Sequence, residues 1–151
     1  MTSSATVTEA ATVCIRPYTP ADAVACVGIF DRAWHAGHPY APRKIDVALL
    51  EAETRDETIL VGESGGSIAG FVSIYLPQSF VHHLYVDPAL QGRGIGTELL
   101  ESVVTLAGGS ASLKCQTRNE SALTFYRRLG WVEVTAGTGE FGPWVALRSP
   151  A

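Results

Sequence analysis

Three glycines lie close together in the segment LYVDPALQGRGIGTELL, residues 84–100, where a β-branched apolar run changes to a helical pattern. At Gly92, Gly94 and Gly96 the chain has no Cβ atoms, so it can turn tightly and a ligand can approach the backbone. The first N–H groups of the following helix lack an intrahelical acceptor and carry about half a positive charge. The segment therefore predicts a phosphate site made of backbone amides, with no need for a lysine.

Two well-known nucleotide motifs fit this segment poorly. A nucleotide P-loop has a lysine after its last glycine, and this chain has Thr97 at that position. A dinucleotide fingerprint has its third glycine in the sixth place, and here Thr97 occupies that place. A glycine-rich turn can also be only a tight connection between a strand and a helix, so the loop by itself leaves the ligand open.

The pattern of apolar residues predicts the elements that position this loop. Val24, Val27 and Phe30 recur at helical spacing and are expected to form the apolar face of one helix. Helices are expected at about 20–34, 45–53, 94–107 and 121–129. Strands are expected at 13–16, 58–63, 68–76, 80–86, 112–117, 131–135 and 143–147. Three consecutive strands followed by a strand–helix–strand crossover indicate a mixed α/β (α+β) fold in three layers.

The composition bounds the class of protein. With 151 residues, 46% hydrophobic and 17% charged, the chain can form one domain, expected at 12–149 after a loose tail at 1–11. A formal net charge of −4 argues against a nucleic-acid partner. The cysteines are three in number, far apart and without metal-ligand spacing, so we expect no metal site and a reduced, cytoplasmic protein. The longest apolar run, 23–30, is too short to cross a bilayer, so no membrane partner is expected.

Two motifs together carry a resemblance to a known family. The run QGRGIG at 91–96 resembles the Q/R-x-x-G-x-G/A signature of the GNAT superfamily of N-acetyltransferases. The run NESALTFYRRLGW at 119–131 resembles that family's second signature, N-x-x-A-x-x-F/L-Y-x-x-x-G-F/W. The motifs stand in the family's order, and the resemblance covers residues 13–148. It implies a GNAT-like three-layer fold, with a central mixed, mostly antiparallel sheet of six to seven strands flanked by about four helices.

The resemblance implies acetyl-CoA as the cofactor, with the diphosphate of coenzyme A on the loop amides and the pantetheine arm beside the preceding strand. Asn119 matches the asparagine that binds the pantetheine, although it can also cap the following helix. Phe125 would pack against the cofactor or serve only as a core residue. The cofactor-binding residues implied in this way are Leu84, Tyr85, Val86, Gln91, Gly92, Arg93, Gly94, Ile95, Gly96, Thr97, Asn119, Ala122, Phe125 and Tyr126.

Tyr126 matches the catalytic tyrosine of the family and is expected to act on the leaving thiolate. In the reaction that the resemblance implies, a neutral amine attacks the thioester carbonyl directly in a ternary complex. A phenol, whose ordinary pKa is about 10, can then protonate the thiolate. Cys115 offers a route through an acyl-enzyme, but its apolar strand setting is better explained by core packing.

His82 is the residue expected to act as the general base. Family members often carry a Glu or His on the strand before the glycine loop, and Phe80 stands where others have an acid. Because side chains alternate along a strand, His82 is expected to share a face with Leu84 and Val86, while His83 points the other way.

The acceptor in this family is bound by the loop after the first helix and by the hairpin of the last two strands. Here Trp34, Tyr40, Phe141 and Trp144 are expected to line that pocket, and Glu140 can pair with an ammonium group. The expected acceptor is a primary amine, on a small molecule or a peptide. Dimers are common in the family, so a homodimer is an expectation that rests on the resemblance alone.

A non-catalytic acyl-CoA-binding or sensor module is the alternative function. The presence of both Tyr126 and Asn119 beside a complete loop favours the enzyme. Release of free thiol from acetyl-CoA in the presence of amines would separate the two functions.

Overall fold

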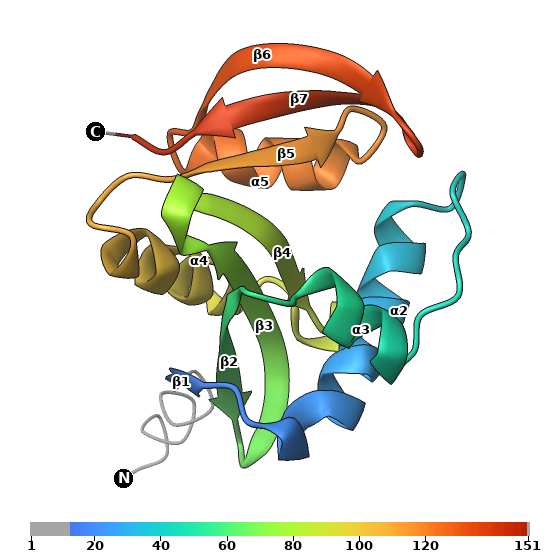
Figure 1. The fold of residues 1–151 in the computed structure, drawn as a ribbon, viewed down its shortest axis with the longest axis vertical. Coiled ribbons are helices and arrows are strands. Elements are labelled where there is room, and N and C mark those ends of the chain that lie inside the picture. The colour runs from blue at the N-terminus through green and yellow to red at the C-terminus, as the bar shows by residue number, and fades with distance from the viewer. Residues whose placement is uncertain (1–12, 151) are drawn as a thin grey trace, which may run out of the picture.

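The computed structural model describes residues 13–150 (Figure 1). The expected tail at 1–11, and residue 12 of the expected domain, lie outside the described residues. Its helices are α2 (Ala23–Gly37), α3 (Val47–Glu53), α4 (Ile95–Leu106) and α5 (Glu120–Arg128). Its strands are β1 (Cys14–Pro17), β2 (Thr58–Ser64), β3 (Ser67–Tyr75), β4 (Phe80–Val86), β5 (Ser112–Gln116), β6 (Val132–Gly139) and β7 (Gly142–Arg148).

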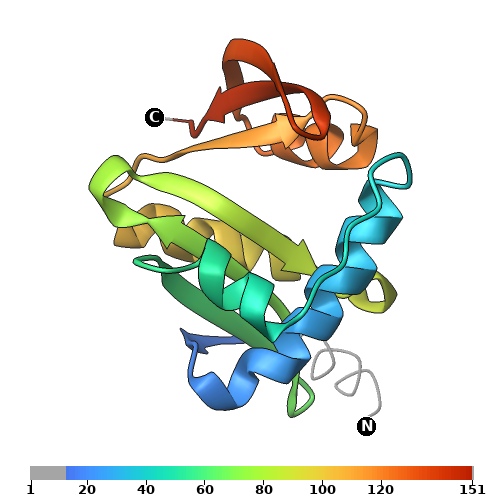
Figure 2. The ribbon, with the colours of Figure 1, turned by 45° about the vertical axis from the view of Figure 1, so that its right-hand side comes forward.

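The seven strands form one sheet in the order β1-β2-β3-β4-β5-β7-β6. Strands β4 and β5 are parallel, and the other neighbouring pairs of this sheet are antiparallel. Helices lie on both sides of the sheet (Figures 1 and 2). The mixed, mostly antiparallel sheet and its three-layer arrangement confirm the expected fold class. No helix among residues 13–150 has the length and apolar character that crossing a bilayer requires.

Each face of the sheet carries its own core. Leu99 and Val103 of α4 are fully buried in one core, together with strand residues of the sheet. On the other face Phe30 of α2 and Leu50 of α3 pack with Phe71 of β3. Burying each apolar side chain of this size stabilises the folded state by about 1.5–3 kcal/mol. The two cores therefore hold α2 and α4 firmly against opposite faces of the central strands.

The expected apolar face of α2 is wrong at Val24, which is 78% exposed. The buried face contains Phe30, as expected, together with Cys26, Ile29 and, one turn further, Trp34. Successive helical residues are rotated by about 100°, so Val24 and Cys26 lie on nearly opposite sides of the helix. Only one of the two sides can face the sheet, and the larger group of apolar residues occupies it.

Strand β6 continues to Gly139, beyond the expected end at residue 135. Residues 136–139, which follow the expected end of this strand, pair with β7, and Gly137 lies opposite Trp144. A Cβ atom at Gly137 would lie 2.5 Å from Cζ2 of Trp144, so the indole packs directly over the glycine backbone. Glycine is needed at this position for side-chain packing and does not end the strand.

Strands β4 and β5 pair over only two positions, Phe80 with Ser112 and Val81 with Leu113. Beyond Val81 they diverge, and β4 continues paired with β3 alone (Figure 2). Residues 82–86 therefore have no strand partner on the side facing β5. This divergence leaves an open edge on the strand beside which the family resemblance places the pantetheine arm.

Candidate active site

A cleft of about 960 Å³ opens where β4 and β5 diverge. Its walls come from α2, β4, the glycine loop, β5, α5 and the β6–β7 turn. Of the expected site residues, the cleft is lined by Trp34, His82, Leu84, Tyr85, Val86, Gln91, Gly92, Gly94, Ile95, Gly96, Thr97, Asn119, Ala122, Phe125, Tyr126 and Phe141. Three others, Arg93, Tyr40 and Trp144, are not part of this lining.

The glycine loop ends at the N-terminus of α4 and faces the cleft. Gly92 and Gly94 have φ values of 85° and 84°, which side chains other than glycine adopt only with strain. The first intrahelical hydrogen bond runs from the Glu98 N–H to the Gly94 carbonyl, at 3.0 Å. The amides of residues 95–97 precede that bond, so they lack an intrahelical acceptor. A Cβ atom at Gly92 would have no neighbour within 4 Å, which leaves space above the loop for a ligand.

Gln91 closes the junction between β4 and the loop. Its side-chain amide donates to the Val86 carbonyl at 3.3 Å, from a position five residues later in the chain. The side chain thereby ties the start of the loop to the end of the strand. Arg93 is exposed and does not line the cleft, whereas its neighbours Gly92 and Gly94 do.

Tyr126, on α5, reaches the cleft with its side chain largely enclosed, at 9% exposure. Its ring packs edge-on against Phe125, with centroids 5.3 Å apart. Burial raises the pKa of the Tyr126 phenol above its ordinary value. The hydroxyl therefore keeps its proton at neutral pH and is available as a donor within the cleft.

Asn119 stands at the junction of β5 and α5 and is the N-cap of that helix. Its side-chain oxygen accepts a hydrogen bond from the Ala122 N–H at 3.4 Å, as the helix-cap interpretation predicts. The structure also brings Asn119 against Gly37 at the end of α2, where a Cβ atom would lie 2.8 Å from Nδ2. Asn119 thus lies between two walls of the cleft, and its contact with a cofactor stays a prediction.

Aromatic rings and one arginine form the end of the cleft near α2. Trp34 stacks on His38, with centroids 3.8 Å apart, and meets the ring of Phe141 edge-on at 5.0 Å. The Arg43 guanidinium carbon lies 4.8 Å from the Trp34 ring centre and 5.0 Å from that of Phe141. Such contacts hold a cation over aromatic faces. Trp34 and Phe141 therefore lie together at this end of the cleft, and their contact with an acceptor stays a prediction.

Tyr40 and Trp144 have other surroundings. The Tyr40 ring lies under the Arg118 guanidinium, and its hydroxyl is enclosed without a hydrogen-bond partner. Trp144 covers Gly137, and Lys114 Nζ lies 4.2 Å from its ring centre. The expectation that Tyr40 and Trp144 line the cleft is therefore wrong, because the sequence does not show which way each ring turns.

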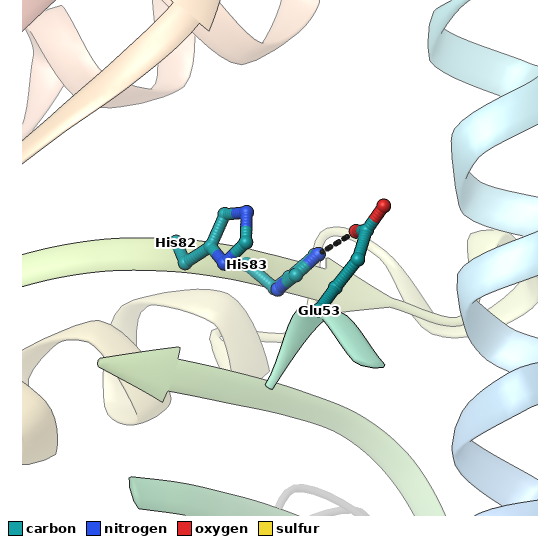
Figure 3. Close-up of side chains that lie close together, drawn as sticks. All are labelled: Glu53, His82 and His83. Atoms are coloured by element: carbon teal, nitrogen blue, oxygen red, sulfur yellow. Dashed lines mark hydrogen bonds and ion pairs between the residues drawn. The ribbon is translucent and has the colours of Figure 1, made fainter. Parts of the chain in front are cut away.

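The expected separation of the two histidines is wrong. In the β3–β4 ladder Ser73 pairs with His83 and Ile74 pairs with Val81, so His82 is an extra residue, a β-bulge. A bulge breaks the strict alternation of side chains. As a result the two imidazoles lie on the same side, with ring centroids 3.9 Å apart (Figure 3).

His83 is buried, at 3% exposure, and both of its ring nitrogens are occupied. Nε2 lies 2.9 Å from Glu53 Oε1, and Nδ1 lies 3.0 Å from Ser73 Oγ. A carboxylate only accepts hydrogen bonds, so we assign the proton to Nε2. Burial lowers the pKa of His83. The ring is therefore neutral and fully paired, and it has no free nitrogen to take a proton.

Glu53 joins His83 to the acceptor end of the cleft. Its carboxylate also pairs with the Arg43 guanidinium. Burial alone would raise the pKa of Glu53, but the hydrogen bonds from His83 and Arg43 outweigh burial and hold it at about 2. Ligand atoms of Glu53, His82 and His83 lie within 4.8 Å of one another. Arg43 adds a positive charge to this group, which favours an internally paired network over binding of a metal cation.

His82 has a different partner, Glu57, from the turn between α3 and β2. His82 Nδ1 lies 2.7 Å from Glu57 Oε2. No sequence motif marks Glu53, Glu57 or Arg43 as site residues, because each is an ordinary charged residue. Packing of α3 and its flanking loops brings Arg43 and Glu53 to the cleft and places Glu57 against His82.

Comparisons with known proteins agree with this geometry. Residues 23–131 match the model of the acetyltransferase (GNAT) family. The chain is 33% identical over 129 residues to the N-alpha-acetyltransferase RimI of Mycobacterium tuberculosis, covering 81% of this chain and 80% of that protein. A GCN5-related N-acetyltransferase structure from Rhodopseudomonas palustris covers 93% of this chain and 96% of its own, with 23% identity and a TM-score of 0.78.

A second solved structure is a putative acetyltransferase, yncA, from Salmonella typhimurium with its cofactor acetyl-CoA. It covers 90% of this chain and 92% of its own, with 22% identity and a TM-score of 0.69. The family match spans the strand, the glycine loop, Asn119 and Tyr126 of the cleft. The chain therefore belongs to the GNAT family of acetyltransferases and transfers the acetyl group of acetyl-CoA to an amine.

Proposed function

We propose that the acceptor is an α-amino group, on a peptide or a small molecule, and that Tyr126 and His82 are the acid and base of the transfer. One observation carries this assignment: the glycine loop, Tyr126 and His82 all line the same cleft. This shared lining supports a mechanism in which the loop binds the cofactor, Tyr126 donates a proton and His82 accepts one.

The loop and the free edge of β4 fit coenzyme A. The unpaired amides of residues 95–97 suit a diphosphate, and the space above Gly92 admits it without a side-chain clash. The β5-facing edge of residues 82–86 can take the amides of a pantetheine arm like an added strand. When bound there, acetyl-CoA supplies an activated acetyl group as its thioester.

Tyr126 is proposed to donate its phenolic proton to the departing sulfur. The phenol is neutral before the reaction, so its proton is available to the thiolate that forms as the C–S bond breaks. A route through Cys115 is disfavoured, because burial raises the pKa of its thiol to about 12 and little thiolate is present.

His82 is proposed to accept the proton that the amine nitrogen loses. The nitrogen exchanges one N–H bond for a C–N bond, and the thioester C–S bond breaks. The sulfur gains the Tyr126 proton, which solvent then replaces. His83 does not fit this role, because its ring is buried and both nitrogens are paired.

The acceptor end has groups that can hold an amine. The Glu140 carboxylate lines the cleft and can attract an ammonium group, while Trp34 and Phe141 supply apolar walls. The M. tuberculosis relative is described as an N-alpha-acetyltransferase.

Free thiols at Cys26 and Cys115 are compatible with the expected cytoplasmic location. The homodimer stays a prediction.

The test is a panel of acceptors with acetyl-CoA, in which thiol release is measured. Peptides with a free N-terminus, the same peptides blocked at the N-terminus but carrying lysine, and simple arylalkylamines are compared. Higher kcat/KM for the free N-termini is the expected result. Equal or better use of blocked, lysine-bearing peptides would overturn the α-amine assignment.

A further inference from the structure

The hydrogen bond between Glu57 and His82 determines which imidazole nitrogen is free. Glu57 Oε2 lies 2.7 Å from His82 Nδ1, and a carboxylate can only accept. In the neutral imidazole Nδ1 therefore carries the proton, and Nε2 keeps its lone pair. The His82 side chain is 36% exposed and lines the cleft, so this lone pair is accessible to a substrate.

Glu57 is buried at a cost that its packing alone does not explain. Its side chain is only 9% exposed, and Oε1 is enclosed without a hydrogen-bond partner. His82 is the one hydrogen-bonding partner of this carboxylate among the described residues. Burying a carboxylate with an unsatisfied oxygen is unfavourable. Such a group is expected where orientation of its partner matters.

The local backbone holds Glu57 toward the bulge. The Glu57 N–H donates to the Thr54 carbonyl at 2.9 Å and closes a tight turn at the end of α3. Within this turn Asp56 has a φ of 70°, the left-handed conformation. On the opposite side the bulge presents the His82 ring. Two irregular features, one on each segment, therefore meet at this hydrogen bond.

The charged and titratable groups around His82 have separate partners. On its own strand, His83 is paired with Glu53 and Ser73. On α3, Glu53 is paired with His83 and Arg43. Among these groups around His82, only the Glu57 carboxylate is left, and it is hydrogen-bonded to His82 alone.

We propose that Glu57 is a positioning residue that fixes the tautomer and orientation of His82, so that Nε2 receives the proton from the acceptor amine. This inference rests on the proposed role of His82 as the base. It assigns to the pair the relation in which a carboxylate orients a catalytic imidazole. Glu57 itself touches neither the amine nor the thioester.

The principal variant is Glu57→Met, which keeps a similar length and fills the buried site but cannot accept the Nδ1 proton. Replacing a buried, half-satisfied carboxylate by an apolar side chain of similar shape is often neutral or stabilising. The melting temperature is therefore expected to stay the same or rise. Turnover is expected to fall about 10²-fold, with KM for acetyl-CoA unchanged. Glu51→Met, an exposed position on α3, is the matched control and keeps full turnover.

The tautomer is measured directly from the ¹⁵N chemical shifts of the His82 ring. In the parent protein Nδ1 is expected to be protonated and Nε2 bare, and in Glu57→Met the proton is shared between both nitrogens. Glu57→Gln retains an oxygen that can accept from Nδ1, so it is expected to keep more activity than Glu57→Met. An unchanged ring spectrum together with full turnover in Glu57→Met would overturn the inference.

A double-mutant cycle separates this inference from the proposed function. If Glu57 acts through His82, Glu57→Met has no further effect on turnover once His82 is alanine. Full activity of His82→Ala would show that His82 is not the general base, and this part of the proposed function would be wrong. Loss of activity in His82→Ala, with additive loss in the double variant, keeps the base and refutes the role of Glu57.

Discussion

Gly37 and Asn119 touch across the cleft although they are 82 positions apart in the chain: a Cβ atom at Gly37 would lie 2.8 Å from Asn119 Nδ2. Gly37 ends α2, and Asn119 caps α5. This contact sets the distance between two walls of the cleft. Any side chain at position 37 must therefore displace the amide that the family resemblance places on the pantetheine arm.

Gly37→Ala is expected to weaken acetyl-CoA binding about tenfold, which corresponds to about 1.4 kcal/mol. Displacement of Asn119 is the physical reason. Isothermal titration with acetyl-CoA measures the effect. Gly28→Ala, in the same helix, is the control, since its added Cβ meets only the flexible end of Arg32. Equal affinities for both variants would show that Asn119 does not hold the cofactor.

Tyr126→Phe is expected to lower turnover by about 10²–10⁴-fold, the contribution of a general acid. Removal of one hydroxyl leaves the packing of the ring against Phe125 intact, so the melting temperature and acetyl-CoA affinity stay near the parent values. Steady-state rates with saturating acceptor provide the measurement. A variant that turns over at the parent rate would exclude Tyr126 from the mechanism.

Gly94→Ala is expected to destabilise the fold by about 1–2 kcal/mol and to weaken acetyl-CoA binding as well. The residue has a φ of 84° and forms the N-cap of α4, so a Cβ there strains the turn that presents the amides. Gly66→Ala is the control: its φ is 83° in the β2–β3 turn, away from the cleft. Urea unfolding and titration calorimetry are compared. The control should lose stability and keep affinity, and a Gly94→Ala protein with parent affinity would argue against the loop as the phosphate site.

The stability of the fold is expected to fall as the pH drops from about 4 toward 2, in part through Asp22. Two hydrogen bonds of 2.9 Å from the Arg16 guanidinium lower the pKa of Asp22 from 3.8 to about 2. A carboxyl whose pKa is lower in the folded state stabilises the fold above its unfolded pKa, and the contribution disappears as the pH approaches the folded pKa. Urea unfolding measured between pH 6 and 2 should therefore show a weaker pH dependence for Asp22→Asn than for the parent. Asp31→Asn, at a more exposed site, should retain the parent curve.

Local patterns were sufficient to predict most of the scaffold. The periodicity of apolar residues placed the helices and strands to within a few positions, because burial of one face imposes a period of 3.6 or 2 on the sequence. The pattern failed where packing between distant segments decides: the helical face at Val24, the end of β6 at Gly137 and the direction of the Trp144 ring.

The sequence by itself determined the glycine loop and Tyr126, because each lies in a short motif whose chemistry depends on neighbouring residues. Only the tertiary structure decided the surroundings of His82, the proposed base. The bulge at His82 arises from a mismatch between two strands, and Glu57 comes from a turn 25 residues earlier. Neither leaves a local pattern, since a hydrogen bond between distant residues constrains where two side chains meet in space and leaves their spacing along the chain free.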